Sequence, residues 1–314
     1  MSEKKIATRE SYGAALVEYA AIDPDVVVLD ADLAAATKTG MFKKAFPERF
    51  IDCGIAECNM IGVAAGLAAA GKKVFASSFA MFAAGRAFEI IRNSVGYPHL
   101  PVKICATHAG ISVGEDGATH QCCEDLALMR TIPGMTVLNP SDDIEAKAVV
   151  KALLHYDAPA YVRLGRLAVP VINDTPDYHF EIGKGIQLRE GKDATILATG
   201  LMVSMALEAA DMLNKEGLSV RVVNIHTIKP IDEEIILKAA KETGLLITAE
   251  EHSVIGGFGS AVSEVCAEKC PVRVVKIGVN DVFGKSGPAA ELLKIYGLSA
   301  EHIAETVRKA IAEK

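Results

Sequence analysis

Aromatic residues, long apolar runs and clusters of basic residues are all scarce in this sequence. Tryptophan is absent, and aromatic residues make up only 5% of the 314 positions. The apolar segment 60–70 is about half as long as the roughly 20 residues that a helix needs to cross a bilayer. The 33 Lys and Arg are outnumbered by 40 Asp and Glu, whereas nucleic-acid binding needs clustered positive charge. We therefore expect no membrane and no nucleic-acid partner, and small-molecule chemistry is the better explanation.

Cysteine usage indicates reduced thiols rather than a disulfide framework. The seven cysteines are odd in number and lie in segments with strand or helix patterns. Cys266 and Cys270 are four positions apart on one predicted helix face, but no second Cys or His pair follows at metal-ligand spacing. We predict that both belong to the core and that this chain holds no metal. Residues 1–5 lack the apolar core of a signal peptide, so we expect a cytoplasmic protein.

Short β-branched runs alternate with longer helical patterns, which is typical of parallel sheets covered by helices on both faces. Expected strands lie at 26–29, 50–53, 73–76, 102–106, 135–138, 160–164, 194–197, 219–223, 245–248 and 272–276. Expected helices lie near 9–21, 57–70, 79–95, 123–130, 142–155, 201–216, 232–242, 257–269 and 300–312. Pro170 and Pro176 interrupt the alternation. We predict an α/β protein with two doubly wound, three-layer α/β/α domains at 1–167 and 193–314, joined by a linker at 168–192.

The loop 107–121 is the most informative segment, because it follows a predicted strand and concentrates glycine, histidine and acidic residues. Loops at the carboxyl ends of parallel strands commonly bind ligands. His108, Asp116 and His120 supply groups that can hold hydroxyls or phosphate, or move a proton near neutral pH. The alternative is a solvated loop whose acids cap the following helix. We favour the ligand-binding interpretation, since a purely structural loop has little use for two imidazoles.

Two further segments leave a structural and a functional interpretation open. Glu57 begins an otherwise apolar helix, where the helix dipole favours a carboxylate and where a buried carboxyl group needs a partner such as a ligand nitrogen. Phe79 and Phe82 are three positions apart and are therefore neighbours on a helix surface. That spacing suits either a core contact or a stacking surface for a flat ring.

Several nucleotide-binding motifs are missing from the sequence. No predicted strand is followed by Gly-x-Gly-x-x-Gly, and Gly-x-x-x-x-Gly-Lys-Ser/Thr does not occur. Dehydrogenases and nucleotide hydrolases are therefore disfavoured. The Gly-x-Ser-x-Gly elbow is missing as well.

Taken in order, a set of motifs resembles the transketolase group of thiamine-diphosphate enzymes. The motifs are Ile55-Ala-Glu-Cys58, Ser78-Phe-Ala-Met-Phe82, Thr107-His108, Gly114-Glu-Asp-Gly-Ala-Thr-His-Gln121 and Glu250-Glu-His-Ser-Val-Ile-Gly-Gly-Phe-Gly259. The Gly-Glu-Asp-Gly-x-Thr-His-Gln string is the most specific of them and looks like transketolase itself. The resemblance covers nearly the whole chain and implies a pyrimidine-binding domain followed by a transketolase C-terminal domain.

The resemblance implies that thiamine diphosphate is the cofactor. Glu57 matches the family's glutamate that hydrogen-bonds the aminopyrimidine N1′ and stabilises the tautomer that removes the thiazolium C2 proton. His120 matches a histidine near the cofactor's amino group that carries protons. Phe79 and Phe82 match the aromatics that stack on the pyrimidine, whereas a glycine at position 85 stands where a third aromatic is expected. Asp32 resembles an acid that lines the cofactor pocket.

The resemblance also implies a sugar-phosphate site. His108 and Arg166 fall where transketolases hold the phosphate, and Arg9 falls near another such position. Ala36 appears in place of a serine of the same phosphate site. Asp116 matches the residue that contacts the substrate hydroxyl beside the reacting carbon.

In the family, an earlier domain binds the diphosphate through a divalent metal, with a Gly-Asp-Gly motif and a later Asn. We find no counterpart here, since Glu115-Asp-Gly117 belongs to the other motif. The resemblance therefore implies the C-terminal half of a split transketolase that transfers a two-carbon ketol unit, as in the pentose phosphate pathway. It implies an N-terminal-half partner chain that mainly holds Mg²⁺ (or Ca²⁺ or Mn²⁺), a homodimer of each chain in an α2β2 assembly, and no activity alone.

Three alternatives remain at this stage. Deoxyxylulose-phosphate synthase shares the Asp-Gly-Ala-Thr-His-Gln string but is normally one long chain. The beta subunit of 2-oxo-acid dehydrogenases has a similar length and a similar Glu-Glu-His region, but it is not expected to carry Gly-Glu-Asp-Gly-x-Thr-His-Gln. A non-catalytic scaffold subunit would be expected to lose Glu57, His108 or Asp116, and all three are present.

Overall fold

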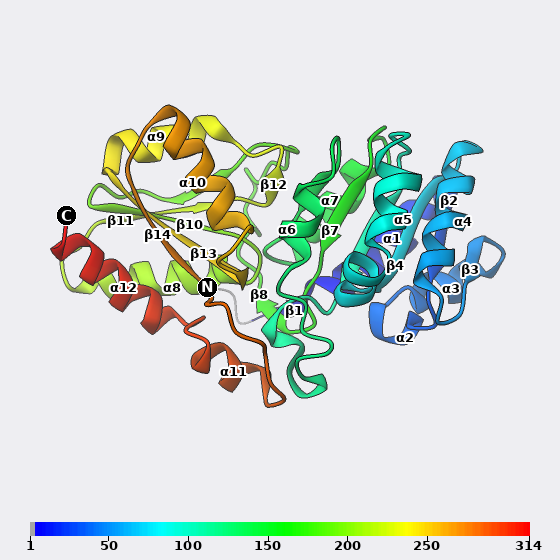
Figure 1. Ribbon diagram of the computed structural model, residues 1–314, viewed down its shortest axis with the longest axis horizontal. Coiled ribbons are helices and arrows are strands. Elements are labelled where there is room, and N and C mark those ends of the chain that lie inside the picture. The colour runs from blue at the N-terminus through cyan, green and yellow to red at the C-terminus, as the bar shows by residue number, and fades with distance from the viewer. Residues whose placement is uncertain (1–3) are drawn as a thin grey trace.

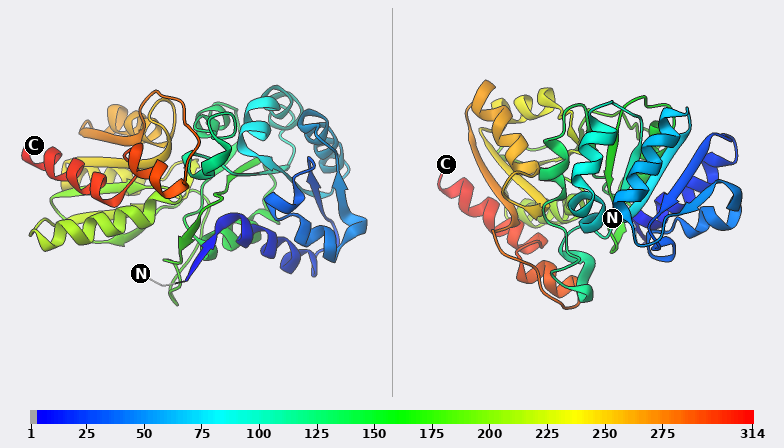
Figure 2. Two further views of the ribbon diagram at one scale, coloured as in Figure 1. Left: turned by 90° about the horizontal axis from the view of Figure 1, so that it is seen from below. Right: turned by 45° about the vertical axis from the view of Figure 1, so that its right-hand side comes forward.

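Residues 4–314, which the computed structural model describes, form two α/β units that lie side by side (Figure 1). Each unit has a central, mostly parallel sheet with helices on both faces, and Figure 2 shows the same arrangement from two other directions. The predicted α/β class with two three-layer domains is confirmed. Residues 1–3, which belong to the segment where we expected no signal peptide, lie outside the described residues. In residues 4–314 no helix is both long enough and apolar enough to cross a membrane.

The first sheet has seven strands in the order β12, β6, β7, β5, β4, β2, β3. The strands are β2 Val26–Asp30, β3 Phe50–Asp52, β4 Lys73–Phe79, β5 Lys103–Thr107, β6 Thr136–Leu138, β7 Ala160–Arg163 and β12 Thr227–Lys229. Neighbouring strands are parallel except for β12, which runs antiparallel to β6. Every residue of β2 and β5 is buried, as expected for strands with helices on both faces.

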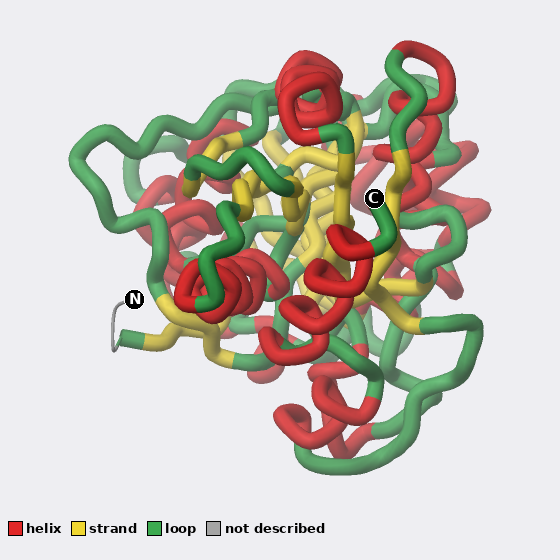
Figure 3. Tube along the Cα trace, turned by 90° about the vertical axis from the view of Figure 1, so that its left-hand side faces the viewer, coloured by secondary structure: helices red, strands yellow, loops and turns green. Residues whose placement is uncertain are grey.

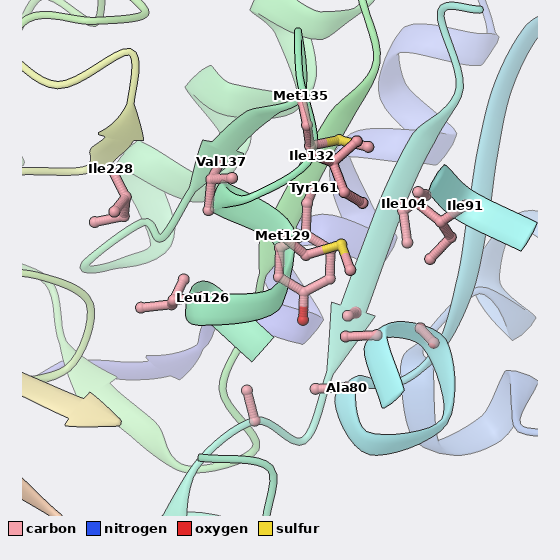
Figure 4. Close-up of a cluster of buried hydrophobic side chains, with 14 of the residues drawn as sticks. Ala80, Ile91, Ile104, Leu126, Met129, Ile132, Met135, Val137, Tyr161 and Ile228 are labelled. Atoms are coloured by element: carbon pink, nitrogen blue, oxygen red, sulfur yellow. The ribbon is translucent and has the colours of Figure 1, made fainter. Parts of the chain in front are cut away.

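Helices cover both faces of the first sheet. The helices are α1 Thr8–Ala20, α2 Ala34–Thr37, α3 Gly40–Ala45, α4 Glu57–Ala69, α5 Phe88–Ile90, α6 Asp125–Arg130 and α7 Asp143–Leu153. On one face, Leu16 of α1 and Leu153 of α7 join Phe75 of β4 in one buried cluster. On the other face lie α4 and α6, and Figure 4 shows Met129 and Ile104 in that second cluster.

Residues 79–95, predicted as a single helix, are more irregular. Strand β4 continues to Phe79, and two π-helical segments, η2 Met81–Arg86 and η3 Ile91–Gly96, flank the short helix α5. Two 3₁₀ segments, η1 Pro47–Arg49 and η4 Ile111–Asp116, complete the first unit. Because π-helical turns are frequent at functional sites, η2 marks this edge of the sheet as a place to look for one.

The second sheet has five strands in the order β14, β13, β10, β11, β9. They are β9 Ile186–Arg189, β10 Ala194–Ala198, β11 Val220–Asn224, β13 Leu245–Ser253 and β14 Arg273–Val279, and only β9 is antiparallel. The helices are α8 Met202–Lys215, α9 Glu233–Thr243, α10 Phe258–Lys269, α11 Ala289–Ile295 and α12 Ala300–Ala312. Helices α8 and α12 pack together, α9 and α10 pack together, and Figure 3 shows helices flanking the strands.

Four short strands were not expected from the sequence, because they pair with segments far along the chain rather than following from a local pattern. Strand β1 Lys5–Ala7 pairs with β8 Ala168–Pro170, and β12 joins the first sheet although it lies far along the chain. The predicted linker 168–192 therefore contains β8 and β9. The exact domain limits stay a prediction.

All seven cysteines are free, as expected for reduced thiols. Cys266 is 2% exposed and buried in the core, and Cys270 is partly buried against the same cluster. Within residues 4–314 no group of three or more His, Cys, Asp or Glu side chains is arranged to hold a metal ion.

A buried polar contact fixes the loop 107–121 against the second unit. Glu251, at the end of β13, accepts a hydrogen bond from the Ser112 backbone, and its own carbonyl accepts one from Arg163 at 2.8 Å. Gly110 has φ +80°, and a side chain there would overlap the Glu251 carboxyl group. Gln121 donates to the carbonyl of Lys285 at 3.0 Å. The contact between the two units therefore determines where this loop lies.

Candidate active site

The carboxyl ends of neighbouring parallel strands bring the predicted site residues to one edge of the first sheet. Phe79 ends β4, and His108 follows β5 immediately. Asp32 lies two residues after β2, Glu57 lies five residues after β3 and Arg166 lies three residues after β7. This edge is where ligands bind in open parallel sheets.

Four aromatic rings form a cluster, which we call the aromatic cluster: Phe79, Phe82, His108 and His120. The centroids of the Phe79 and His108 rings are 3.9 Å apart and the rings are stacked. The Phe82 ring meets His120 edge-on at 5.3 Å and lies parallel to Phe79 at 6.1 Å. Phe79 is 7% exposed, whereas Phe82 and His120 are only partly buried. Phe79 is thus a core contact, and Phe82 presents a partly open ring.

Glu57 begins α4 but is paired with a side chain from another element. Its carboxylate is 2% exposed, and Oε2 accepts a hydrogen bond from Arg86 Nη1 at 2.8 Å. The Arg86 guanidinium also lies over the Phe82 ring, 5.0 Å from its centroid. Oε1 of Glu57 has no hydrogen-bond partner in the part of the chain that the structure describes. A simple capping role therefore does not account for this carboxylate.

Position 85 is a glycine where the resemblance leads us to expect an aromatic residue, and the Met81 side chain occupies the space beside it. A Cβ on Gly85 would overlap the ε-methyl group of Met81, four residues earlier in η2. Met81 therefore lies where a larger residue 85 would begin, and the surface beside Phe82 is not simply empty.

Basic side chains gather beside the aromatic cluster and form what we call the cationic group: Arg9, Lys38, His108 and Arg166. Arg9 Nη1 lies 3.2 Å from His108 Nε2 and donates to the carbonyl of Ala36 at 2.8 Å. Arg9 Nε is buried without a hydrogen-bond partner among the described residues. This buried, unpaired donor is available to a ligand oxygen.

The electrostatics of the cationic group favour an anion. Burial chiefly, followed by the charges of Arg9 and Arg166, lowers the pKa of His108 to about 3. Burial and Arg166 also lower the pKa of Arg9, which Glu10 opposes. Neutral His108 keeps its Nδ1 within 2.9 Å of the Thr107 hydroxyl. An anion bound here would relieve the repulsion between the two guanidinium groups.

The loop 107–121 is largely buried rather than solvated, since Ile111–Gly114 is inaccessible and only its outer turn is exposed. Arg166 donates to Glu115 Oε2 at 2.9 Å and to the carbonyl of Val113. Gly114 has φ +85°, and its open face lets Arg166 approach to 3.3 Å from where a Cβ would stand. Asp116 lies on the exposed outer turn.

A second acid on the same edge was missed by the sequence interpretation. Asp30 is buried, and burial raises its pKa although its carboxylate accepts hydrogen bonds from Thr37 and Thr39 at 2.7 and 2.8 Å. These bonds shape the turn that carries Ala36 to Arg9. Asp32 is exposed with φ +62°. The sequence signal for Asp30 was its position at the end of an apolar strand, followed later by Thr37-x-Thr39.

The structure brings together most of the predicted residues but not all of them. Direct contacts connect the aromatic cluster with Arg9 and, through Arg86, with Glu57, whereas Asp32 and Asp116 are exposed nearby on their loops. The cavities of about 330 and 450 Å³ are lined by other residues. Arg86, Lys38 and Met81 were not predicted, because their importance depends on contacts between distant segments.

Known proteins match the chain along nearly all of its length. The transketolase pyrimidine binding domain matches residues 4–171, and the transketolase C-terminal domain matches residues 183–303. The putative transketolase C-terminal section of Methanocaldococcus jannaschii is 52% identical over 98% of this chain and 96% of its own length. The 6-deoxy-6-sulfo-D-fructose transketolase subunit of Clostridium sp. (strain MSTE9) is 45% identical over 98% and 95%.

A similar fold is present in a solved structure described as a split gene transketolase, inactive beta4 tetramer. It is 57% identical, covers 98% of this chain and 99% of that one, and has a TM-score of 0.91. These domains imply dependence on thiamine diphosphate, and Arg86 joins the two residue types that a heteroaromatic ring requires, an aromatic ring at Phe82 and a carboxylate at Glu57. The order of the domains, their geometry and these similarities agree: the chain belongs to the transketolase family and corresponds to its C-terminal half, with a pyrimidine-binding domain and a transketolase C-terminal domain.

Proposed function

We propose that this chain is the catalytic C-terminal subunit of a split transketolase, which transfers a two-carbon ketol unit from a ketose phosphate to an aldose phosphate. The observation that supports this most is the placement of a buried carboxylate, a partly open aromatic ring and the cationic group along one sheet edge. Relatives of similar length are named as a C-terminal section and as a transketolase subunit.

Glu57 and Phe82 would hold the cofactor's aminopyrimidine ring. When bound, thiamine diphosphate supplies the carbanion and the electron sink of the reaction. Glu57, through Oε1, would hydrogen-bond the ring nitrogen N1′, and its buried position would keep water away from that bond. Phe82, backed by Phe79, offers the stacking surface, and Asp32 lines the edge of the ring site.

The cationic group would bind the anionic end of the substrate. Arg9 and Arg166 contact the phosphate, and neutral His108, whose Nε2 accepts from Arg9, lines the phosphate site without adding charge. Asp116 holds the hydroxyl beside the reacting carbon, and His120 moves a proton near the cofactor's amino group. The relative named for a sulfosugar carries a sulfonate in its substrate name, and the same charges accommodate either anion.

A partner chain completes the proposal. An N-terminal-half chain would hold the diphosphate and Mg²⁺ and form an α2β2 assembly with two copies of this chain in the cytoplasm. The similar structure described as an inactive beta4 tetramer supports the view that such chains assemble without activity when alone.

The test compares this chain alone with the chain plus its partner. Both receive thiamine diphosphate, Mg²⁺, D-xylulose 5-phosphate and D-ribose 5-phosphate, and sugar products are followed by chromatography. Turnover only with the partner is expected, and full turnover by the chain alone would refute the partner dependence. Product from pyruvate instead of from xylulose 5-phosphate would favour a synthase or a 2-oxo-acid dehydrogenase. Unchanged turnover in a Glu57→Ala complex would remove Glu57 from the mechanism.

A further inference from the structure

One ion pair joins the two elements that would contact the pyrimidine ring. Glu57 is the first residue of α4 and Arg86 is the last residue of η2. Arg86 Nη1 lies 2.8 Å from Glu57 Oε2, and the two side chains are 51% and 2% exposed, respectively. A guanidinium from the surface thus reaches a carboxylate that is otherwise shielded from water.

Two further contacts hold Arg86 in this position. Its guanidinium carbon lies 5.0 Å from the centroid of the Phe82 ring, within the range of a cation–π contact. Its backbone carbonyl accepts a hydrogen bond from the Cys58 thiol at 3.6 Å, so η2 is tied to the first turn of α4 a second time. Arg86 therefore couples the orientation of the acid to the position of the stacking ring.

The ion pair uses only one of the two carboxylate oxygens. Oε2 is held by Arg86, while Oε1 has no hydrogen-bond partner within residues 4–314. Because one carboxylate oxygen is fixed, the other has a single accessible orientation. A ligand group that binds Oε1 therefore does not bear the entropy cost of ordering this side chain.

We propose that Arg86 is a positioning residue, which holds Oε2 of Glu57 so that Oε1 is presented to the nitrogen of a heteroaromatic ring stacked beside Phe82. The inference rests on the proposed function and deepens it by naming the residue that orients the acid. In this proposal Arg86 acts through Glu57. Arg86 is half open to water but Glu57 is buried, so loss of Arg86 also leaves a shielded carboxylate without its partner; the orientation of Glu57 is therefore tested by cofactor affinity, with stability measured separately.

A double-mutant cycle on cofactor affinity tests this role. The reconstituted complex with its partner chain is titrated with thiamine diphosphate at fixed Mg²⁺ by isothermal calorimetry. The variants are Arg86→Met, Arg86→Lys, Glu57→Gln and the double variant Glu57→Gln/Arg86→Met. Arg92→Met is the matched control, since Arg92 is exposed in the next π-helical segment and, among residues 4–314, donates only to its neighbour Asn93.

Arg86→Met is expected to raise the Kd for thiamine diphosphate on the order of fivefold, and Arg86→Lys to recover part of this loss. In the Glu57→Gln background the same change should alter Kd less than about twofold, because the oriented acid is already gone. Arg92→Met should leave Kd unchanged. Thermal unfolding of each variant checks that the fold is retained.

If the wild-type complex binds thiamine diphosphate, two results would overturn the role of Arg86 without affecting the proposed function. An equal loss in both backgrounds would mean that Arg86 acts through Phe82 or the fold rather than through Glu57. Equal or tighter binding of thiamine diphosphate by the Arg86→Met complex would mean that Arg86 plays no part in binding or competes with the cofactor ring. A wild-type complex that binds no thiamine diphosphate would overturn the proposed function, and the inference with it.

Discussion

Replacing Asp125 with alanine should destabilise the protein by about 3–5 kcal/mol, because it removes one partner of a fully buried ion pair. Arg163 Nε lies 2.9 Å from Asp125 Oδ2, and the two side chains are 4% and 0% exposed. Tyr161 donates its hydroxyl to the same oxygen at 2.8 Å. Burial lowers the pKa of Arg163, but Asp125 and Glu251 raise it above its ordinary value, so the guanidinium stays charged. Without Asp125 that charge is left buried and unpaired.

Urea unfolding followed by circular dichroism measures the loss, and a surface pair supplies the control. Glu264→Ala removes the exposed partner of Arg130, for which we expect a loss of about 1 kcal/mol or less. If Asp125→Ala costs no more than this control, the reasoning about burial is refuted. Arg163 also donates to the carbonyls of Cys122 and Glu251, so Asp125→Ala should loosen the loop 107–121 in addition.

Four shorter predictions concern the charges and the loop. Arg9→Gln should raise the pKa of His108, because burial and then the charge of Arg9 hold that pKa at about 3. NMR titration of the imidazole in the free chain measures this pKa, and an unchanged pKa in the variant would contradict the prediction. In the active complex, Arg9→Gln should raise KM for D-xylulose 5-phosphate roughly tenfold, since one charge-assisted hydrogen bond to phosphate is lost. The KM for uncharged D-xylulose should not change. Equal effects on both sugars would argue against an anion at Arg9. Burial raises the pKa of Glu145 and Glu251 from 4.5 to about 7, so the folded state binds more protons between these values and stability should fall as pH rises across that window. Glu145→Gln should flatten the dependence of the urea midpoint on pH, and a wild-type midpoint that stays constant from pH 5 to 8 would exclude this effect. Gly110→Ala should cost at least about 1 kcal/mol in urea unfolding, because φ is +80° and the new methyl group meets Glu251; wild-type stability would show that the loop adapts.

The buried strands were predictable, and the short edge strands were not. Val26–Asp30 and Ala194–Ala198 are mostly apolar and buried at every residue, so composition alone indicated strands at 26–29 and 194–197. Lys5–Ala7 and Thr227–Lys229 are three residues long and owe their structure to partners far along the chain. The order of the strands in the sheet is a property of those distant pairings, which no local pattern contains.

At the site, the sequence indicated candidate residues but not which side chains contact one another. Glu57 and Phe82 were singled out in the sequence, but their surroundings left a structural interpretation open and only the family resemblance suggested their roles. Arg86 was part of the same apolar segment as Phe82, yet its importance comes from a contact with Glu57, 29 positions earlier. Asp30 was overlooked because the carboxylate that ends a strand is as often a cap, and only its bonds to Thr37 and Thr39 reveal what it shapes.

The strand order arranges the site from a cationic end to an acidic end. Arg166 follows β7, His108 follows β5, Phe79 ends β4 and Glu57 follows β3, in a sheet ordered β7, β5, β4, β2, β3. Neighbouring strands lie about 4.8 Å apart, so Phe79, at the end of β4, lies between Arg166 and Glu57 along this edge. If the proposed sugar phosphate lies along this edge, we expect its anion near Arg9 and Arg166 and its carbonyl near the ring site. We expect a 2-oxo acid, whose carboxylate is directly attached to its reacting carbonyl, to leave the partly buried Arg9 without an anion, which is a reason to propose a ketose phosphate instead.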